Sequence, residues 1–225
     1  MGRWIALSEP HTIRRLTLPL SRDEARSLTL GETVLLDGEA TMTAGFPTHQ
    51  RIVKVLDEGR KLPLPMANGA FFHMGSSCRQ EGGRWITNYV NPTTSTRFDD
   101  YMPGIVRQLG LTATGGKGGM GRASVEALRD VGCVYFSMPG GASPLLSTGA
   151  VERLQTGWDD LIEQFRLSRF RLDGFGPVTV AIDAHGNSMY EVIQDGAAAR
   201  MPQILEGLEQ ARRESAARLA ATKRV

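Results

Sequence analysis

The chain has 225 residues, of which 41% are hydrophobic and 22% are charged, and its formal net charge is +2. A chain of this length and composition can bury one substantial core, so a single globular domain over 1–225 is expected. The small charge excess excludes the strongly basic class of nucleic-acid binders, and two cysteines can neither build a disulfide framework nor supply a metal or cluster with three ligands.

The first half of the chain alternates between helical and extended patterns. Residues 1–20 show no clear period and are expected to form an extended arm. Ser21 and Glu24 match a capping box, and Asp37-Gly38 separates two apolar runs, which is the pattern of a hairpin with a tight turn. The hydrophobic pattern predicts helices over 22–30 and 47–58, and strands over 34–36, 40–42, 70–74 and 85–90.

The second half is predicted to contain three helices and four strands. Gly110 suits the C-terminus of the helix that follows Arg97, and residues 183–187 form a turn between two strands. No segment is apolar enough over its length for a signal peptide or a membrane span, so a cytoplasmic protein is expected. The helices are expected after Arg97, over 122–131 and from about 197 to 225, and the strands over 112–114, 133–136, 178–182 and 189–192.

In the stretch 91–121, Arg97 and Lys117 lie among hydroxyl side chains and residues that form turns. The residues alone leave two interpretations open. In the first, threonines cap the helix that follows, and Arg97 pairs with Asp99 or Asp100. In the second, the two cations bind an anion, because a guanidinium presents paired donors at the spacing of a carboxylate.

Residues 116–121 fit the pattern G-x-G-x-x-G of a dinucleotide-binding loop. The next strand ends near Ser137 without the acidic residue that would hold a ribose, so a flexible turn with a solvated lysine explains the loop equally well. His49 lies near a predicted helix start, where it could contact an anion or only decorate the surface. His73 lies in an apolar strand, which is typical of a hydrogen-bonded core histidine.

Three motifs occur together in an order and spacing that resemble one known family. They are Pro92-Thr93-Thr94-Ser95-Thr96-Arg97, the glycine-rich segment 116–121, and 175–177 leading into Ile182-Asp183-Ala184-His185-Gly186-Asn187. The combination resembles the β subunit of the iron–sulfur class I fumarases and L(+)-tartrate dehydratases. This resemblance runs from Leu16 to Val192. It implies an α/β fold, a swivelling β/β/α three-layer domain of the class I fumarase C-terminal type.

The resemblance also implies an active site shared between two chains. In the family, an α subunit holds a [4Fe-4S] cluster through three cysteines, and neither Cys78 nor Cys133 falls on a ligand position. We therefore expect no metal site in this chain, an α subunit as its partner, an α2β2 assembly, and a hydroxy acid or unsaturated acid as substrate. Thr93 corresponds to the family's catalytic base. The residues expected to bind the substrate are Arg97, Lys117, Thr94, Gly116, Gly118 and His49.

One departure from the family pattern concerns the substrate. Where the family has Arg-Asp, this chain has Gly45-Phe46, so an ion-pairing group is expected to be replaced by empty space and an aromatic ring. The expected substrate then lacks the second carboxylate of fumarate or tartrate, or carries a neutral group there. The alternative is a non-catalytic regulatory or structural paralogue, which the loss of Arg-Asp favours and the retention of Thr93, Arg97 and Lys117 opposes. A nucleotide-binding protein is the third interpretation.

Overall fold

The computed structural model describes residues 13–222, which contain a mixed α/β domain with eight strands in one sheet and six α-helices. The strands are β1 (Arg14–Leu18), β2 (Thr33–Thr43), β3 (Ala70–Glu81), β4 (Arg84–Pro92), β5 (Ala113–Gly116), β6 (Val134–Ser137), β7 (Ala150–Gly157) and β8 (Leu167–Ile182). The helices are α1 (Arg22–Ser27), α2 (Phe46–Asp57), α3 (Met102–Leu109), α4 (Arg122–Val131), α5 (Ser143–Gly149) and α6 (Met189–Thr222). Short 3-10 turns lie at Ser95–Phe98, Gly140–Ala142 and Glu163–Phe165.

The chain separates into two compact units, of which the first ends at Ser188 and the second begins at Met189. The first unit contains the eight strands and α1 to α5, and the second contains α6. The single domain expected over 1–225 remains a prediction.

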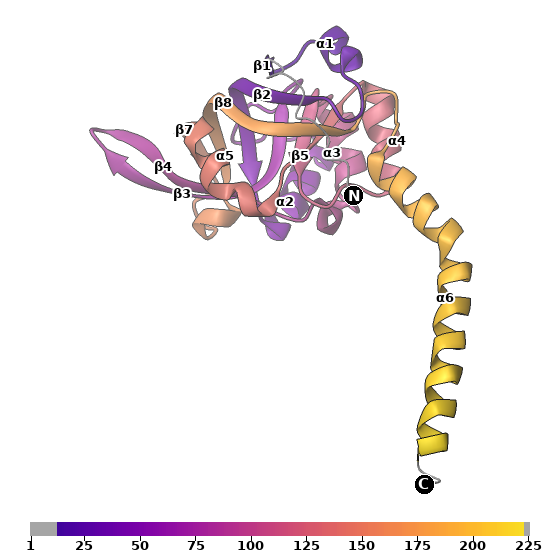
Figure 1. Ribbon diagram of the computed structural model, residues 1–225. Coiled ribbons are helices and arrows are strands. Elements are labelled where there is room, and N and C mark those ends of the chain that lie inside the picture. The colour runs from indigo at the N-terminus through magenta and orange to yellow at the C-terminus, as the bar shows by residue number, and fades with distance from the viewer. Residues whose placement is uncertain (1–12, 223–225) are drawn as a thin grey trace. The chain divides into compact units, whose positions relative to one another are not determined.

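The sheet of the first unit combines parallel and antiparallel pairs. Its strand order is β1-β2-β3-β4-β7-β8-β6-β5, and the further pairings of β2 with β8 and of β3 with β5 close it on itself. Figure 1 shows the long strand β8 passing across the sheet, where it pairs antiparallel with β2, β6 and β7. Because β2, β3, β5 and β6 run parallel to their neighbours, the loops that follow β2, β5 and β6 emerge at the same edge.

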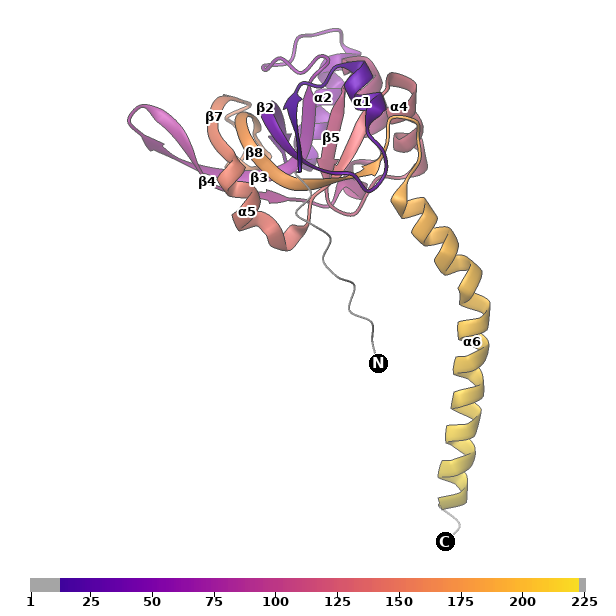
Figure 2. The same ribbon diagram turned by 45° about the horizontal axis from the view of Figure 1, so that its top comes forward.

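Aromatic side chains fill the centre of this sheet. Phe72, Phe136, Phe170 and Phe175 are fully buried, and the rings of Phe72 and Phe175 stack with their centroids 6.2 Å apart. The outer parts of β3 and β4 extend away from this core as an antiparallel ribbon (Figures 1 and 2), and β4 also pairs with β7 at Trp85 and Ile86. The core therefore holds the inner ends of β3 and β4 in place, and the candidate site lies where β4 ends.

The hairpin expected at Asp37-Gly38 is wrong. Residues Thr33–Thr43 form one strand, β2, which pairs with β1, β3 and β8. Gly38 has a φ of 91°, and a Cβ at this position would collide with the carbonyl oxygen of Leu18. The glycine thus permits the close approach of β1, and the register shift around it is a bulge within the strand.

The strand expected over 189–192 is also wrong, because α6 begins at Met189. The turn before it is confirmed, since one carboxylate oxygen of Asp183 accepts hydrogen bonds from the backbone N–H groups of His185 and Asn187. Ile182 and Ser188 form an isolated bridge, after which the chain leaves the sheet. The alanine-rich sequence that follows favours a helix, and α6 begins at the first residue that is no longer paired with a strand.

Most other predicted elements are confirmed. The capping box of Ser21 and Glu24 starts α1, Gly110 ends α3 in the left-handed conformation, and α4 covers the predicted residues 122–131. The expected arm lies outside the described residues up to position 12, and its later part contains β1. Sequence patterns missed α5, β7 and the first half of β8.

Candidate functional site

The loop after β4 and the loop after β5 are joined by backbone hydrogen bonds. The N–H of Thr93 donates to the carbonyl oxygen of His73 (2.8 Å), and the N–H of Lys117 donates to that of Thr93 (3.1 Å). The N–H of Ser95 donates in turn to the carbonyl oxygen of Lys117 (2.8 Å), and Thr94 and Lys117 form an isolated bridge. These bonds place the Pro-Thr-Thr motif and the glycine-rich loop side by side.

Arg97 lies close to Thr93 on the 3-10 turn that follows it. A guanidinium nitrogen of Arg97 donates a short hydrogen bond to the hydroxyl oxygen of Thr93. Among residues 13–222, neither Arg97 nor Lys117 has a carboxylate within ion-pair distance, although many other arginines of this unit do. Arg97, beside the hydroxyl of Thr93, and Lys117, on the adjoining loop, thus form what we call the cradle, a pair of cations that suits an anion.

Asp99 does not pair with Arg97, so the first interpretation of this stretch is wrong on that point. Its carboxylate accepts hydrogen bonds from the N–H of Gly121 (2.9 and 3.0 Å) and from the hydroxyl of Ser124 (2.9 Å). Gly121 is the N-terminal cap of α4 and has no side chain of its own to satisfy this helix end. Asp99 thus holds the start of α4, and with it the end of the glycine-rich loop.

The glycines of this loop are required by space and by conformation. A Cβ at Gly116 would collide with the hydroxyl of Ser95, and Gly118 and Gly119 have φ of 81° and 75°. A Cβ at Gly140, in the loop after β6, would lie 3.5 Å from the ammonium of Lys117. The loop after β6 therefore approaches Lys117 as well.

A chain of buried polar groups lies beneath the Pro-Thr-Thr motif, and sequence reasoning missed it. Nδ1 of His73 is hydrogen-bonded to the hydroxyl of Ser95 (2.8 Å), which is hydrogen-bonded to the hydroxyl of Tyr135 (2.8 Å). Nε2 of His73 faces the sulfur of Met102 at 3.3 Å. Burial lowers the pKa of His73 well below its usual value, and the nearby His49 adds to this. The prediction of a hydrogen-bonded core histidine is confirmed.

His49 is fully buried, so its interpretation as a surface residue is wrong. Its ring stacks on that of Phe98 with centroids 3.8 Å apart, and its Nδ1 donates to the carbonyl oxygen of Gly45 (2.7 Å). Burial lowers the pKa of His49 to about 4, and the charge of Arg97 adds to this lowering. Nε2 has no hydrogen-bond partner within the described part of the chain. In the neutral ring, Nε2 is an acceptor, because Nδ1 carries the proton.

The space beside Gly45 is filled, which corrects the expectation that it would be empty. A Cβ at Gly45 would lie 2.8 Å from Cβ and 2.9 Å from Cα of Phe165. The carbonyl oxygen of Phe165 accepts hydrogen bonds from the hydroxyls of Thr43 (3.0 Å) and Thr48. The segment around Phe165 therefore covers the turn where the family has an arginine.

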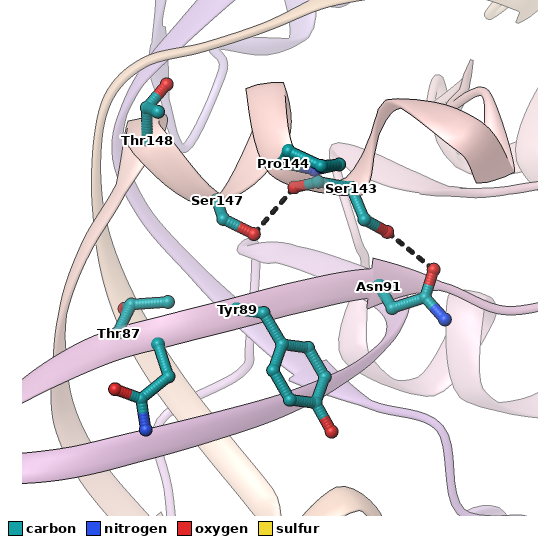
Figure 3. Close-up of a pocket in the computed structure, with 8 residues that line it drawn as sticks. Thr87, Tyr89, Asn91, Ser143, Pro144, Ser147 and Thr148 are labelled. Carbon is teal, nitrogen blue, oxygen red and sulfur yellow. Dashed lines mark hydrogen bonds between the residues drawn. The ribbon is translucent and has the colours of Figure 1, made fainter.

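A cavity of about 660 Å³ opens between β4 and α5 (Figure 3). Its lining is uncharged and consists of Thr87, Asn88, Tyr89, Asn91, Ser143, Pro144, Ser147 and Thr148. The hydroxyl of Ser143 donates to the side-chain oxygen of Asn91 (2.6 Å), and the hydroxyl of Ser147 donates to the carbonyl oxygen of Ser143 (2.6 Å). The cavity thus adjoins the motif, which begins one residue after Asn91, but it contains none of the predicted site residues.

The two cysteines do not form part of the cradle. Cys133 is fully buried and Cys78 is half-buried, and burial raises the pKa of both thiols. Over residues 13–222, no group of three or more His, Cys, Asp or Glu side chains is arranged to hold a metal ion. No helix in the same range has the length and apolar character needed to cross a membrane.

Comparison with known proteins identifies the family. The family model described as fumarase C-terminus matches residues 5–193 of the chain. The chain belongs to the fumarase C-terminal family. It is 31% identical over 176 residues to a protein of Methanocaldococcus jannaschii that carries the name of an L(+)-tartrate dehydratase subunit beta, covering 77% of this chain and 89% of that protein.

Two further relatives agree with this assignment. The L(+)-tartrate dehydratase subunit beta of Escherichia coli K12 is 29% identical over 174 residues, covering 77% of this chain and 85% of that protein. A protein of Geobacillus stearothermophilus that carries the name of a class I fumarate hydratase is 27% identical over 197 residues, which are 85% of this chain and 36% of that longer protein. The family resemblance inferred from the three motifs is thus confirmed.

Proposed function

We propose that the chain is the β subunit of a [4Fe-4S]-dependent hydro-lyase, and that it contributes the base and the anion-binding side chains to a site completed by an α subunit. The observation that carries this proposal is that Thr93, Arg97 and Lys117 lie on two loops joined by hydrogen bonds. Neither of the two cations has a carboxylate partner among residues 13–222. Membership of the fumarase C-terminal family supports it. The swivelling three-layer arrangement and an α2β2 assembly are part of the same proposal.

In this proposal, Thr93 moves a proton. In the dehydration direction, its hydroxyl oxygen takes a proton from the substrate carbon next to a carboxylate, and its own proton passes to an acidic side chain of the α subunit. A threonine is a weak base by itself, and the hydrogen bond from Arg97 to this oxygen favours its negatively charged form. The position of Thr93 is fixed by the backbone bond to His73.

Arg97 and Lys117 hold the carboxylate on which charge develops. Removal of the proton pushes electron density onto that carboxylate, and fixed cations stabilise a charge most where it forms. Thr94, Gly116 and Gly118 belong to the same two loops, and the proposal counts them among the residues that bind the substrate. A [4Fe-4S] cluster held by the α subunit would supply Lewis-acid chemistry at the substrate hydroxyl and carboxylate. The raised thiol pKa values of Cys78 and Cys133 fit a cluster held by the other chain.

The proposed substrate lacks a carboxylate near Gly45. Phe165 fills the space beside Gly45, and Arg51 is held by both carboxylate oxygens of Asp160 at 2.8 and 2.7 Å. His49 is neutral, because its pKa is about 4. Neither Arg51 nor His49 thus offers a free cation in place of the family's arginine, and loss of such a clamp weakens binding of a C4 dicarboxylate by about 2 to 5 kcal/mol.

The test is an anaerobic reconstitution of the chain with its α subunit, followed by assays on fumarate, tartrate and a series of 2- and 3-hydroxy acids. We expect turnover of an acid with one carboxylate and little turnover of fumarate. Thr93→Ala should lower turnover a hundredfold or more, by about the contribution of a positioned base, at an unchanged melting temperature. Thr96→Ala, an exposed neighbour outside the cradle, serves as control. Normal fumarate turnover would contradict the proposed specificity. An active Thr93→Ala variant would contradict the assignment of Thr93 as the base.

The second candidate is a non-catalytic paralogue that stabilises or regulates an α subunit. The closed space beside Gly45 favours it, because it removes one substrate-binding position of the family. The same reconstitution decides between the two. A pair that assembles but converts none of the acids, with or without Thr93, supports this second candidate.

A further inference from the structure

The helix α6 exposes an apolar stripe along much of its length. The six side chains Ile193, Met201, Ile204, Leu205, Leu208 and Leu219 are between 48% and 64% exposed. Figure 1 shows α6 as one continuous helix, which contains Pro202 in its interior. The family model ends at residue 193, so nearly all of the stripe lies beyond the part that this model matches. A helix of this kind gains most of its stability from packing of its apolar face, and the stripe requires a partner.

The spacing of the stripe is that of a two-stranded coiled coil. Positions 197, 201, 204, 208, 211 and 215 follow one another at intervals of four, three, four, three and four residues, and they hold Ala, Met, Ile, Leu, Ala and Ser. An average interval of 3.5 residues keeps such a row of side chains, the seam, facing a second helix along its whole length. Leu205 and Leu219 adjoin this seam on one side, and the small residues in it allow two helices to approach closely.

We propose that this stripe pairs with α6 of a second copy of the chain in the antiparallel direction, with the two-fold axis near residue 206. In this register, Leu208 packs beside Ile204 of the second copy and Met201 beside Ala211. Leu205 then meets its own counterpart across the axis.

Charge complementarity selects this partner and this direction. In the antiparallel register, Arg200 lies beside Glu214 of the second copy, and the symmetry forms this ion pair twice. Arg218, which falls in the seam, then lies opposite Gln194. A parallel pair would place Arg218 against Arg218 and would leave Glu214 beside Leu219, so it would gain neither ion pair.

Disulfide trapping in the full chain tests the direction of pairing. Leu205→Cys places two thiols next to each other across the two-fold axis, whereas Leu219→Cys places them about 40 Å apart, from 1.5 Å of rise per residue. We expect efficient disulfide-linked dimers for Leu205→Cys alone under mild oxidation. The unmodified chain, with Cys133 buried and Cys78 half-buried, sets the background. Equal trapping by both variants would contradict the antiparallel register and would overturn the proposal, as would trapping by neither.

Charge reversal tests the ion pairs by sedimentation equilibrium. Arg200→Glu and Glu214→Arg each create two like-charge contacts, so each should weaken the dimer on the order of tenfold. The double variant restores opposite charges and should return to within about threefold of the parent dissociation constant. Failure of the double variant to recover, or a parent chain that is monomeric at all concentrations, would refute the proposal. None of these outcomes depends on catalysis, so the proposed hydro-lyase function stands or falls separately.

Discussion

Arg97 and Lys117 differ from most cations of the first unit in how their charges are balanced. Arg15, Arg84 and Arg107 each have a carboxylate partner. Arg97 instead donates to the hydroxyl of Thr93, and Lys117 approaches the loop at Gly140. At the residue scale, neither side chain has a negatively charged partner among the described residues, and a substrate carboxylate would bring one.

His49 makes folding stability depend on pH. Its folded pKa of about 4 lies below the ordinary value of 6.5, so its contribution is fully present above pH 6.5 and is lost as the pH falls toward 4. His49→Asn keeps a donor at the position of Nδ1 but cannot take up a proton. Between pH 6.5 and 4, the parent chain should therefore lose about 3 kcal/mol more of its free energy of unfolding than the His49→Asn variant loses. Urea unfolding of both proteins at several pH values measures this difference. If the free energy of unfolding depends on pH in the same way in both, His49 does not titrate as described.

Gly45 is predicted to tolerate no side chain. Gly45→Ala forces its Cβ against Cα and Cβ of Phe165 and should destabilise the chain by about 1 to 3 kcal/mol. Gly104→Ala in α3 is the matched control, because a Cβ there meets nothing within 4 Å and alanine favours a helix by about 0.5 to 1 kcal/mol. Thermal unfolding of both variants should therefore shift in opposite directions. A neutral Gly45→Ala would mean that the segment around Phe165 moves aside easily.

At the scale of elements, the site depends on helix ends and loops that other elements hold. Gly121 begins α4 without a capping side chain, and Asp99, from the turn after β4, supplies the acceptor. The parallel strands β2, β5 and β6 direct their following loops to one edge. The cradle is therefore assembled from segments that are distant in sequence, and a change in one element displaces groups that belong to another.

Asp99→Ala should cost about 1 to 2 kcal/mol, which is the usual effect of removing a helix cap. It leaves the N–H of Gly121 and the hydroxyl of Ser124 without their acceptor, so the glycine-rich loop should also loosen around Lys117. Arg122→Ala is the control on the same helix, because the contact of Arg122 among the described residues is an exposed ion pair with Glu126, worth about 0.5 kcal/mol or less. Denaturant midpoints compare the two. Equal effects would show that the contact with Asp99 is not a cap.

At the scale of the whole molecule, the two units differ in how their stability arises. The first unit buries an aromatic core, whereas each described side chain of α6 from Val192 to Ala216 is exposed. The family model ends at residue 193, so almost all of the long helix lies beyond the part that this model matches.

Removal of residues 194–225 should leave the first unit folded. The deletion takes away no buried side chain among those that the structure describes, so the melting temperature followed by tryptophan fluorescence should change by no more than about 2 °C. Far-UV circular dichroism should show a loss of helix over the same deletion. A truncated chain that melts much lower would show that α6 supports the first unit.

Local patterns determined much of what was predicted correctly. A capping box, a glycine at a helix end and a helical period act within a few residues, so α1, the end of α3 and the extent of α4 follow from the sequence. Three motifs together also determined the family, because their order and spacing are specific although each motif alone is not.

Only the tertiary structure decided how these segments meet. The glycine of Asp37-Gly38 fits a turn or a close approach of strands equally well, and the approach of Leu18 selects the second. The strand β7 carries two buried charged residues, Glu152 and Arg153, whose burial is offset by ion pairs with Arg84 and Glu163 from other segments. The bond from Arg97 to Thr93 and the filling of space beside Gly45 by Phe165 likewise arise between segments. The sequence alone thus pointed to Arg97 and Lys117, while contacts between distant segments decided that neither has a carboxylate partner among the described residues.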